Sequence, residues 1–392
     1  MASLYNPFIK NNRQKNLLKL GSDLADSFAL RADKIDQEGR FPSENFEELK
    51  QSGYVSLTVP EHFGGNGINL YEFVMLQEKI ASGDASTALS IGWHLGIMLE
   101  MRDDQTWSDS VFERMAKLIV NEHALLNRAA SEPATGSPTR GGMPQTKAIS
   151  KNDSWIITGR KSFTSMAPGL HYALVSAQID DTEETGFFLV DMNLPGVKIV
   201  DNWDTMSMRG TRSDDLILTN VELPLDALIE GPETEKGELP KAWLLHIPAC
   251  YLGVAIAARN EAITFASEYS PNSLPGPIKD VPEVQRKIGE MELELLRARE
   301  MMYSVADRWV TEPEKRANMG PELAAVKHVA TNSAARVVDL AMRIVGARGL
   351  FKDNPMQRYY RDVRAGLHNP PMDDAVISML AKRALSTSEK PS

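Results

Sequence analysis

The stretch that decides the fold reads Arg343-Ile-Val-Gly346-Ala-Arg-Gly349-Leu-Phe351, and it is followed by Arg361-Asp362-Val-Arg-Ala-Gly-Leu367-His368-Asn369-Pro370-Pro371. Gly346 and Gly349 predict a break in a helix, because glycine is a poor helix former and adopts backbone angles that other residues avoid. An Arg-Asp pair and a polar turn come after this break. A second polar turn lies in the first half of the chain, at Ala129-Ala-Ser131-Glu-Pro-Ala-Thr-Gly-Ser137.

The pattern of apolar residues changes twice along the chain. Between residue 11 and about residue 125, apolar residues recur at the helical period. Phe73, Gln77 and Ile80, for example, lie on one face of an expected helix. From about 126 to 230, short β-branched and aromatic runs alternate with Gly, Pro, Asn and Asp, which is typical of strands. After residue 240 the helical period returns. We therefore expect an α+β fold: an N-terminal helical domain (1–125), a central antiparallel β-barrel or sandwich (126–235) and a C-terminal four-helix bundle (236–392).

Composition excludes several classes of protein. The 392 residues carry a formal net charge of −10, so a general nucleic-acid binder is not expected. The most apolar run, Trp243–Ala258, contains His246 and Pro248 and is too short to span a membrane, and no signal peptide is recognisable. We expect a cytoplasmic protein. Cys250 is the only cysteine and is interpreted as packing, and the histidines have no metal-ligand spacing, so no metal is expected.

Four motifs in this order resemble the acyl-CoA dehydrogenase superfamily of flavoenzymes, and the resemblance spans nearly the whole chain. The turn from Ser131 to Ser137 is similar to the threonine-glutamate-proline segment of the family, with serine replacing threonine. Its hydroxyls and amides are expected to bind the flavin, which is FAD or FMN. The stretch Lys161-Ser-Phe163-Thr-Ser165 resembles the strand whose aromatic residue covers the flavin and whose hydroxyl reaches N5, roles that Phe163 and Ser165 fit.

The other two motifs are Met208-Arg-Gly-Thr-Arg-Ser-Asp214, a turn that faces flavin and substrate in the family, and the broken helix itself. In the family, this part of the bundle contacts the dinucleotide of a neighbouring subunit. The resemblance thus implies a homo-oligomer, a tetramer or a dimer, with Arg343 and Gly346 at the cofactor. Arg343 stands where glutamine is usual, and it either binds a phosphate or caps the surface of the bundle.

Departures from the family pattern concern the catalytic base. Acyl-CoA desaturation needs a carboxylate, and the turn that usually supplies it reads His368-Asn-Pro-Pro-Met-Asp373-Asp374 here. The second position known in relatives falls at Trp243, and Leu244 replaces the neighbouring arginine. Ser273 likewise replaces an arginine that grips the FAD diphosphate. A general base contributes about 10²–10⁴-fold to the rate of a reaction. Its absence from both positions therefore counts for more than the motif resemblance when the reaction is predicted.

These losses match the reduced-flavin-dependent monooxygenase branch of the superfamily, which resembles dibenzothiophene monooxygenase and has a Leu-His-Asp-Pro turn similar to Leu367-His368-Asn369-Pro370. His368 is then the catalytic candidate, since imidazole titrates near neutral pH. The substrate would be a small sulfur- or nitrogen-containing molecule, with reduced flavin supplied by a separate reductase.

Two alternatives remain open. The first is an acyl-CoA dehydrogenase that uses FAD, has Asp373 or Asp374 as a displaced base and passes electrons to an electron-transferring flavoprotein. The second is a family member that has lost catalysis and serves as a binding scaffold.

Overall fold

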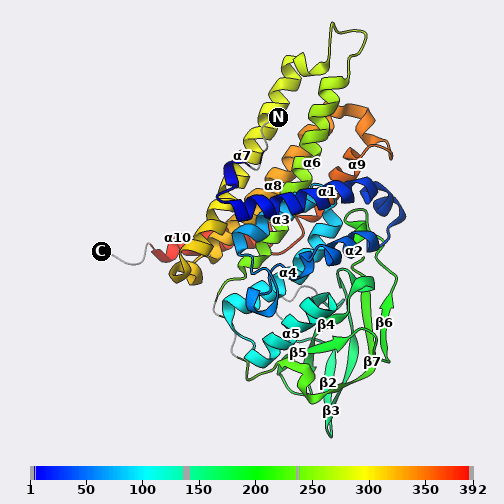
Figure 1. Cartoon of the computed structure of the whole chain (residues 1–392), viewed down its shortest axis with the longest axis vertical. Coiled ribbons are helices and arrows are strands. Elements are labelled where there is room, and N and C mark those ends of the chain that lie inside the picture. Colours follow the sequence, from blue (N-terminus) through cyan, green and yellow to red (C-terminus); the bar gives the residue numbers. More distant parts are fainter. Residues whose placement is uncertain (1–3, 5, 136–141, 235–236, 238, 388–392) are drawn as a thin grey trace.

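The computed structural model of the chain describes residue 4 and residues 6–135, 142–234, 237 and 239–387. Figure 1 shows long helices at one end of the molecule, the β-sheet at the other and the N-terminal helices between them. The expected three-part architecture is confirmed, because the order is helices, strands, helices.

The N-terminal helices are α1 (Asn12–Glu38), α2 (Ser43–Gln51), α3 (Leu70–Ala81), α4 (Ala85–Asp104) and α5 (Asp109–Glu122). A capping box at Asn69 and Glu72 starts α3. The sequence predicted one buried face for α3, yet nearly all of this helix is buried. The reason is that α3 packs against α1 on one side and against the C-terminal helix α6 on another, so both helical parts share one core.

The central part is one eight-stranded sheet with the order β6-β7-β3-β2-β4-β5-β8, and β1 pairs with β4. The strands are β1 (Leu126–Ala129), β2 (Lys147–Lys151), β3 (Ser154–Lys161), β4 (Tyr172–Ile179), β5 (Thr185–Asp191), β6 (Val197–Val200), β7 (Asp215–Pro224) and β8 (Leu228–Glu230). The pairings are antiparallel as expected, except that β1 and β2 each run parallel to β4. The register of β3 against β7 brings Lys161 opposite Leu216.

The C-terminal helices are α6 (His246–Glu268), α7 (Pro282–Thr311), α8 (Gly320–Val345), α9 (Met356–Ala365) and α10 (Asp373–Thr387). The apolar helical stretch around α6 is longer than the sequence suggested, since Ala242–Glu268 could by length and composition cross a membrane. Its most apolar window is 89% buried inside the protein, as in a core helix. Cys250 of α6 is buried, and burial raises the pKa of its thiol well above the ordinary value, so packing explains this residue.

The N-terminal helices and the sheet meet at His94 of α4. The Leu126 amide of β1 donates to His94 Nδ1 (3.0 Å), and His94 Nε2 donates to the Val55 carbonyl (2.9 Å). These two bonds require the neutral imidazole with its proton on Nε2. Burial lowers the pKa of His94 to about 4, which keeps the ring neutral at physiological pH.

This junction predicts a loss of stability in mild acid. The unfolded chain takes up the His94 proton first as pH falls below about 6.5, so the folded state loses about 1 kcal/mol between about pH 7.5 and about pH 5.5. Urea unfolding at the two pH values measures this loss. His94→Gln should remove that part of the pH dependence, and an unchanged dependence in this variant would contradict the assignment to His94.

Candidate functional site

The turn at Ser131 is held by a buried ion pair that the sequence did not predict. Glu132 Oε1 accepts from Lys161 Nζ (2.6 Å) and from the Thr146 hydroxyl (2.7 Å), and Glu132 Oε2 accepts from the Gln145 amide (2.6 Å). Burial alone would raise the pKa of Glu132, but these donors outweigh it and hold the pKa below its ordinary value. The carboxylate therefore stays ionised and anchors the turn to the end of β3.

Past Lys161, the chain presents an aromatic ring to solvent. The Ser162 amide donates to the Ser131 carbonyl (2.9 Å), which joins the two motifs. Phe163 is 67% exposed, and its ring packs edge-on against Trp203 at a centroid distance of 5.7 Å. The indole N–H of Trp203 donates to the Met208 carbonyl (3.2 Å), so the ring that supports Phe163 is itself fixed.

Several residues around this ring have backbone angles that are rare outside glycine. Phe163, Met166, Met208 and Arg212 have φ between 42° and 56°. Such conformations cost free energy and persist where the surrounding structure requires them, often at binding sites. Phe163, Met208 and Arg212 lie in two of the motifs that carry the family resemblance, and Met166 directly follows one of them. The rare backbone angles and the motifs therefore fall in the same region.

The hydroxyl of Ser165 is the end of a chain of hydrogen bonds. Ser165 Oγ lies 2.9 Å from Ser213 Oγ, and Ser213 Oγ lies 2.9 Å from Thr211 Oγ1. Thr211 Oγ1 donates to the Met208 carbonyl (2.9 Å). Each hydroxyl has one proton, and a carbonyl only accepts, so Ser213 donates to Thr211 and Ser165 donates to Ser213. Ser165 is left with lone pairs and no free proton, which makes it an acceptor.

Both flavin-facing candidates, Phe163 through Trp203 and Ser165 through Ser213 and Thr211, thus depend on the backbone of Met208, which α9 holds in place. The Met208 amide donates to Asp362 Oδ1 (2.7 Å), and Arg361 Nη1 donates to the Met206 carbonyl (2.6 Å). Arg361 also pairs with Asp36 of α1. The Arg-Asp pair of the opening stretch therefore joins α9, α1 and the Met208 turn within one chain. Sequence spacing gave no sign of this contact, since 154 residues separate Met208 from Asp362.

Asp362 yields a prediction with a pH dependence. Burial raises its pKa to about 7, against the opposing effect of Arg358 and the Met208 amide. The folded state therefore keeps a proton that the unfolded chain has released, and stability falls by about 1 kcal/mol as pH rises from about 6 to about 8. Asp362→Asn, which keeps an acceptor, should remove this fall in urea unfolding. Asp362→Leu should cost about 1–3 kcal/mol, because the Met208 amide loses its partner. Equal stability of the two variants would contradict this reading.

The turn with the catalytic candidate His368 follows α9 directly. His368 is exposed, and its amide donates to the Ala365 carbonyl (3.0 Å). The next residue, Asn369, accepts a hydrogen bond from the Tyr251 hydroxyl of α6 (2.7 Å). Gly366 permits this approach, since a Cβ there would lie 2.7 Å from the Tyr251 ring. The Asn369 side chain therefore ties the turn to α6, while the exposed imidazole of His368 can meet a ligand.

The two candidate aspartates lie beyond this turn, at the start of α10. Asp373 accepts from Asn332 Nδ2 (2.9 Å) and lies 3.2 Å from His328 Nδ1 and 3.7 Å from Lys327 Nζ. Burial would raise the pKa of Asp373, but Asn332 and the two basic neighbours outweigh it and lower this pKa. Asp374 is exposed. Asp373 is thus a weakly basic carboxylate that ties α10 to α8.

The remaining candidates are spread along the chain. Arg343 is exposed and pairs with Asp339 one turn earlier in α8 (2.8 Å). Gly346 ends α8 with φ of 67°, and a Cβ there would meet nothing within 4 Å. Ser137 lies outside the described residues. Their expected contacts with a flavin remain predictions. Trp243 at the second base position is 6% exposed and packs on His246.

The groups around Phe163 suit a planar ring cofactor. An exposed aromatic face, the acceptor Ser165 and the buried Thr164 hydroxyl, which has no partner among the described residues, lie on consecutive residues. Ser131 is joined to them through Ser162. Within the described residues, no group of three or more His, Cys, Asp and Glu side chains could hold a metal ion. Fold and site together define a flavin-dependent oxidoreductase.

Comparison with known proteins gives the family. The chain matches the N-terminal, middle and C-terminal domains of acyl-CoA dehydrogenases over residues 12–103, 127–221 and 245–369. It is 51% identical over 380 residues to the putative acyl-CoA dehydrogenase YdbM of Bacillus subtilis. The alignment covers 97% of this chain and 99% of YdbM. This protein therefore belongs to the acyl-CoA dehydrogenase family.

Solved structures with the same fold perform different chemistry. FMN-bound TdsC from Paenibacillus sp. A11-2, a dibenzothiophene monooxygenase, has a TM-score of 0.84 and 23% identity over 95% of this chain and 98% of its own. Butyryl-CoA dehydrogenase from Megasphaera elsdenii has a TM-score of 0.83 and 20% identity over 96% and 99%. The shared fold does not choose between oxygenation and desaturation, so the choice depends on the residues of the site.

Proposed function

We propose that this protein is a reduced-flavin-dependent monooxygenase that acts on a small sulfur- or nitrogen-containing molecule. A separate reductase would supply reduced FMN or FAD. When bound, reduced flavin supplies the two electrons with which one atom of dioxygen enters the substrate and the other leaves as water. TdsC, whose fold this chain shares, has been crystallised with FMN and indole, which supports a small planar substrate.

The observation that carries the proposal is the direction of the hydroxyl chain. In the role that the family resemblance gives it, Ser165 would lie beside flavin N5. Reduced flavin has a proton on N5 and donates there, whereas oxidised flavin only accepts. Because Ser165 gives its own proton to Ser213, it complements the reduced form (2.9 Å between the hydroxyl oxygens). An enzyme that collects reduced flavin needs this preference.

The residues at the two positions where relatives have their catalytic base support the same proposal. Trp243 occupies one of the two positions where relatives have their carboxylate, and the His368 turn occupies the other. Asp373, the nearest carboxylate in sequence, has a lowered pKa and is engaged with α8. A carboxylate with a lowered pKa removes a proton less readily, so it is poorly suited to take one from a thioester.

The test is the affinity of the full-length protein for oxidised and reduced FMN under anaerobic conditions. One hydrogen bond contributes about 0.5–1.5 kcal/mol, so reduced FMN should bind up to about tenfold more tightly. Ser213→Ala frees the Ser165 proton, which can then donate to oxidised N5. The preference should vanish or reverse, with a fall of about 30 mV in the potential of bound FMN for each tenfold change.

Ser56→Ala is the matched control, because this hydroxyl donates to the Gly53 carbonyl of the N-terminal part. It should leave the potential unchanged. Tighter binding of oxidised FMN by the unaltered protein, or an unchanged potential in Ser213→Ala, would refute the proposal.

The second candidate function is that of an acyl-CoA dehydrogenase. It is favoured by the 51% identity to YdbM, a putative acyl-CoA dehydrogenase. Its partner would be an electron-transferring flavoprotein. Anaerobic mixing with a series of acyl-CoA thioesters should then bleach the bound flavin, and the double variant Asp373→Asn, Asp374→Asn should abolish the bleaching. The proposed monooxygenase predicts no bleaching.

The expected homo-oligomer remains a prediction for either candidate function. Sedimentation of the purified protein measures its oligomeric state.

A further inference from the structure

Four side chains between α3, α4 and α6 form a buried group with unused hydrogen-bonding atoms. They are Gln77, Trp93, Trp243 and His246, and we call them the α4–α6 polar group. Within the described part of the chain, both amide atoms of Gln77, both ring nitrogens of His246 and both indole nitrogens have no hydrogen-bond partner. Each buried polar atom without a hydrogen-bond partner costs about 1–3 kcal/mol of stability. The gathering of several such atoms in one place therefore needs an explanation outside the protein's own contacts.

The rings in this group enclose His246 from several sides. Trp243 lies parallel to His246 with 5.7 Å between centroids, and Trp93 meets it edge-on at 4.7 Å. Glycines of α4 allow this approach. A Cβ on Gly92 would lie 2.2 Å from His246 Nδ1 and 2.3 Å from Gln77 Nε2, so these two nitrogens lie close to the same point beside the backbone of α4.

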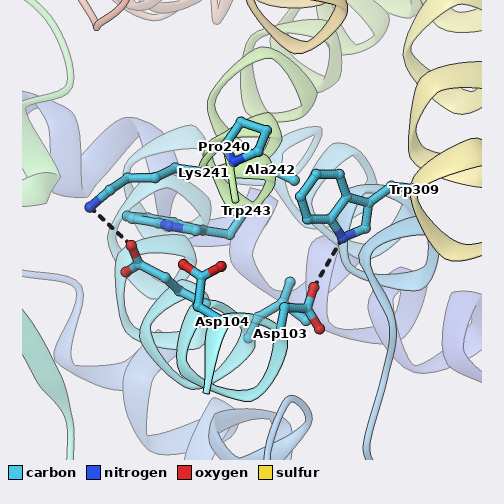
Figure 2. Close-up of a pocket in the computed structure, with 9 residues that line it drawn as sticks. Asp103, Asp104, Pro240, Lys241, Ala242, Trp243 and Trp309 are labelled. Carbon is cyan, nitrogen blue, oxygen red and sulfur yellow. Dashed lines mark hydrogen bonds and ion pairs between the residues drawn. The ribbon is translucent and has the colours of Figure 1, made fainter. Parts of the chain in front are cut away.

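Two of the four side chains connect the group to the surface. Trp93 is the one residue of the fully described stretch 85–101 of α4 that is not buried. Trp243 lines a small crevice together with Pro240, Lys241 and Trp309, as Figure 2 shows. A ligand would therefore reach His246 and Gln77 once the Trp243 ring turns toward this crevice.

The hydrogen-bonding groups and the charge of the α4–α6 polar group limit the chemical class of ligand that it can bind. The two indoles and the Gln77 amide offer N–H donors, and none of the four side chains carries a formal charge. Burial lowers the pKa of His246 to about 3, so the imidazole also stays neutral. An anion would lose its hydration without gaining a countercharge, whereas a neutral oxygen acceptor would satisfy the donors. The flat aromatic walls suit a small aromatic body.

We propose that the α4–α6 polar group is the inner end of the substrate pocket and that it binds a neutral oxygen acceptor, such as a sulfoxide, sulfone or amide carbonyl, on a small aromatic molecule. Trp243 is the side chain that moves to admit it. Only the identification of this ligand as the substrate rests on the proposed monooxygenase function.

Calorimetric titration of the full-length protein, with and without FMN, tests the site with methyl phenyl sulfone and thioanisole, which differ by the two sulfone oxygens. The unaltered protein should bind the sulfone about tenfold more tightly than thioanisole. His246→Phe and Gln77→Met should each abolish this preference. Neither should lower the melting temperature, because neither removes a bond that the protein makes to itself. His62→Phe, at an exposed position, is the matched control and should keep the preference.

Equal affinity for the two compounds, or retention of the preference in both variants, would overturn the proposal. A lower melting temperature with an unchanged preference would do the same, since the polar atoms would then serve the fold. The titration needs neither a reductase nor turnover. Its result therefore holds even if the proposed monooxygenase function is wrong. Gln77→Met gives a second readout if His246→Phe does not fold.

Discussion

Replacement of Lys161 by methionine should cost about 3–5 kcal/mol of stability and most of the flavin affinity. Lys161 is fully buried and is the countercharge of Glu132, with 2.6 Å between Nζ and Oε1. Methionine fills a similar volume and cannot pair with the carboxylate, so a buried charge would be left with hydrogen bonds alone. The Ser131 turn would then lose its anchor to the strand that leads to Phe163. Urea unfolding and FMN titration measure the two losses.

The double variant Glu132→Gln, Lys161→Met makes this prediction specific. With both charges gone, much of the loss from Lys161→Met should be recovered, because the two side chains are in contact and their effects do not add. Lys147 supplies the matched control, since its pair with Asp181 (2.6 Å) lies on the surface. Lys147→Met should change stability by less than about 1 kcal/mol. Equal effects of Lys161→Met and Lys147→Met would contradict the role given to the buried pair.

The three-part fold could be predicted from sequence because its evidence is local. The change from a helical period to short β-branched runs near Leu126 is visible without knowledge of any contact, and β1 begins there. The burial of α3 on all sides was not predictable in this way. It arises because α6, which starts at His246, packs on a face of α3 that its own sequence does not mark as buried.

The site was predictable only in part. The family resemblance pointed to Ser131, Phe163 and Ser165, whose structural surroundings suit a flavin. It gave no sign of what positions them, because those partners are distant in sequence. Lys161 meets Glu132 across 29 residues, and Asp362 meets Met208 across 154. Hydrogen-bond direction also depends on the whole chain of groups, so the acceptor character of Ser165 follows only from the contacts of Ser213 and Thr211.

Replacement of His368 by alanine should lower turnover with reduced flavin by about 10²–10⁴-fold, the usual contribution of a proton donor or acceptor. The imidazole is exposed on a turn that the Asn369 side chain ties to the Tyr251 hydroxyl (2.7 Å). It would supply or remove the proton that moves during oxygen transfer. Affinity for flavin and substrate should stay within a few-fold of the unaltered protein, since none of the hydrogen bonds among the described residues involves this side chain. Oxygen consumption coupled to product formation measures turnover.

A second substitution separates this role from simple packing. His368→Gln keeps a polar side chain but cannot take up and release a proton as imidazole does, so turnover should stay as low as in His368→Ala. Tyr251→Phe removes the bond to Asn369 and should lower turnover only moderately, as expected for a positioning residue. His62→Ala, at another exposed histidine, should leave turnover unchanged. If His368→Ala kept normal turnover and Asp373→Asn with Asp374→Asn abolished it, the base would lie on α10, and desaturation would replace oxygenation as the reaction of this site.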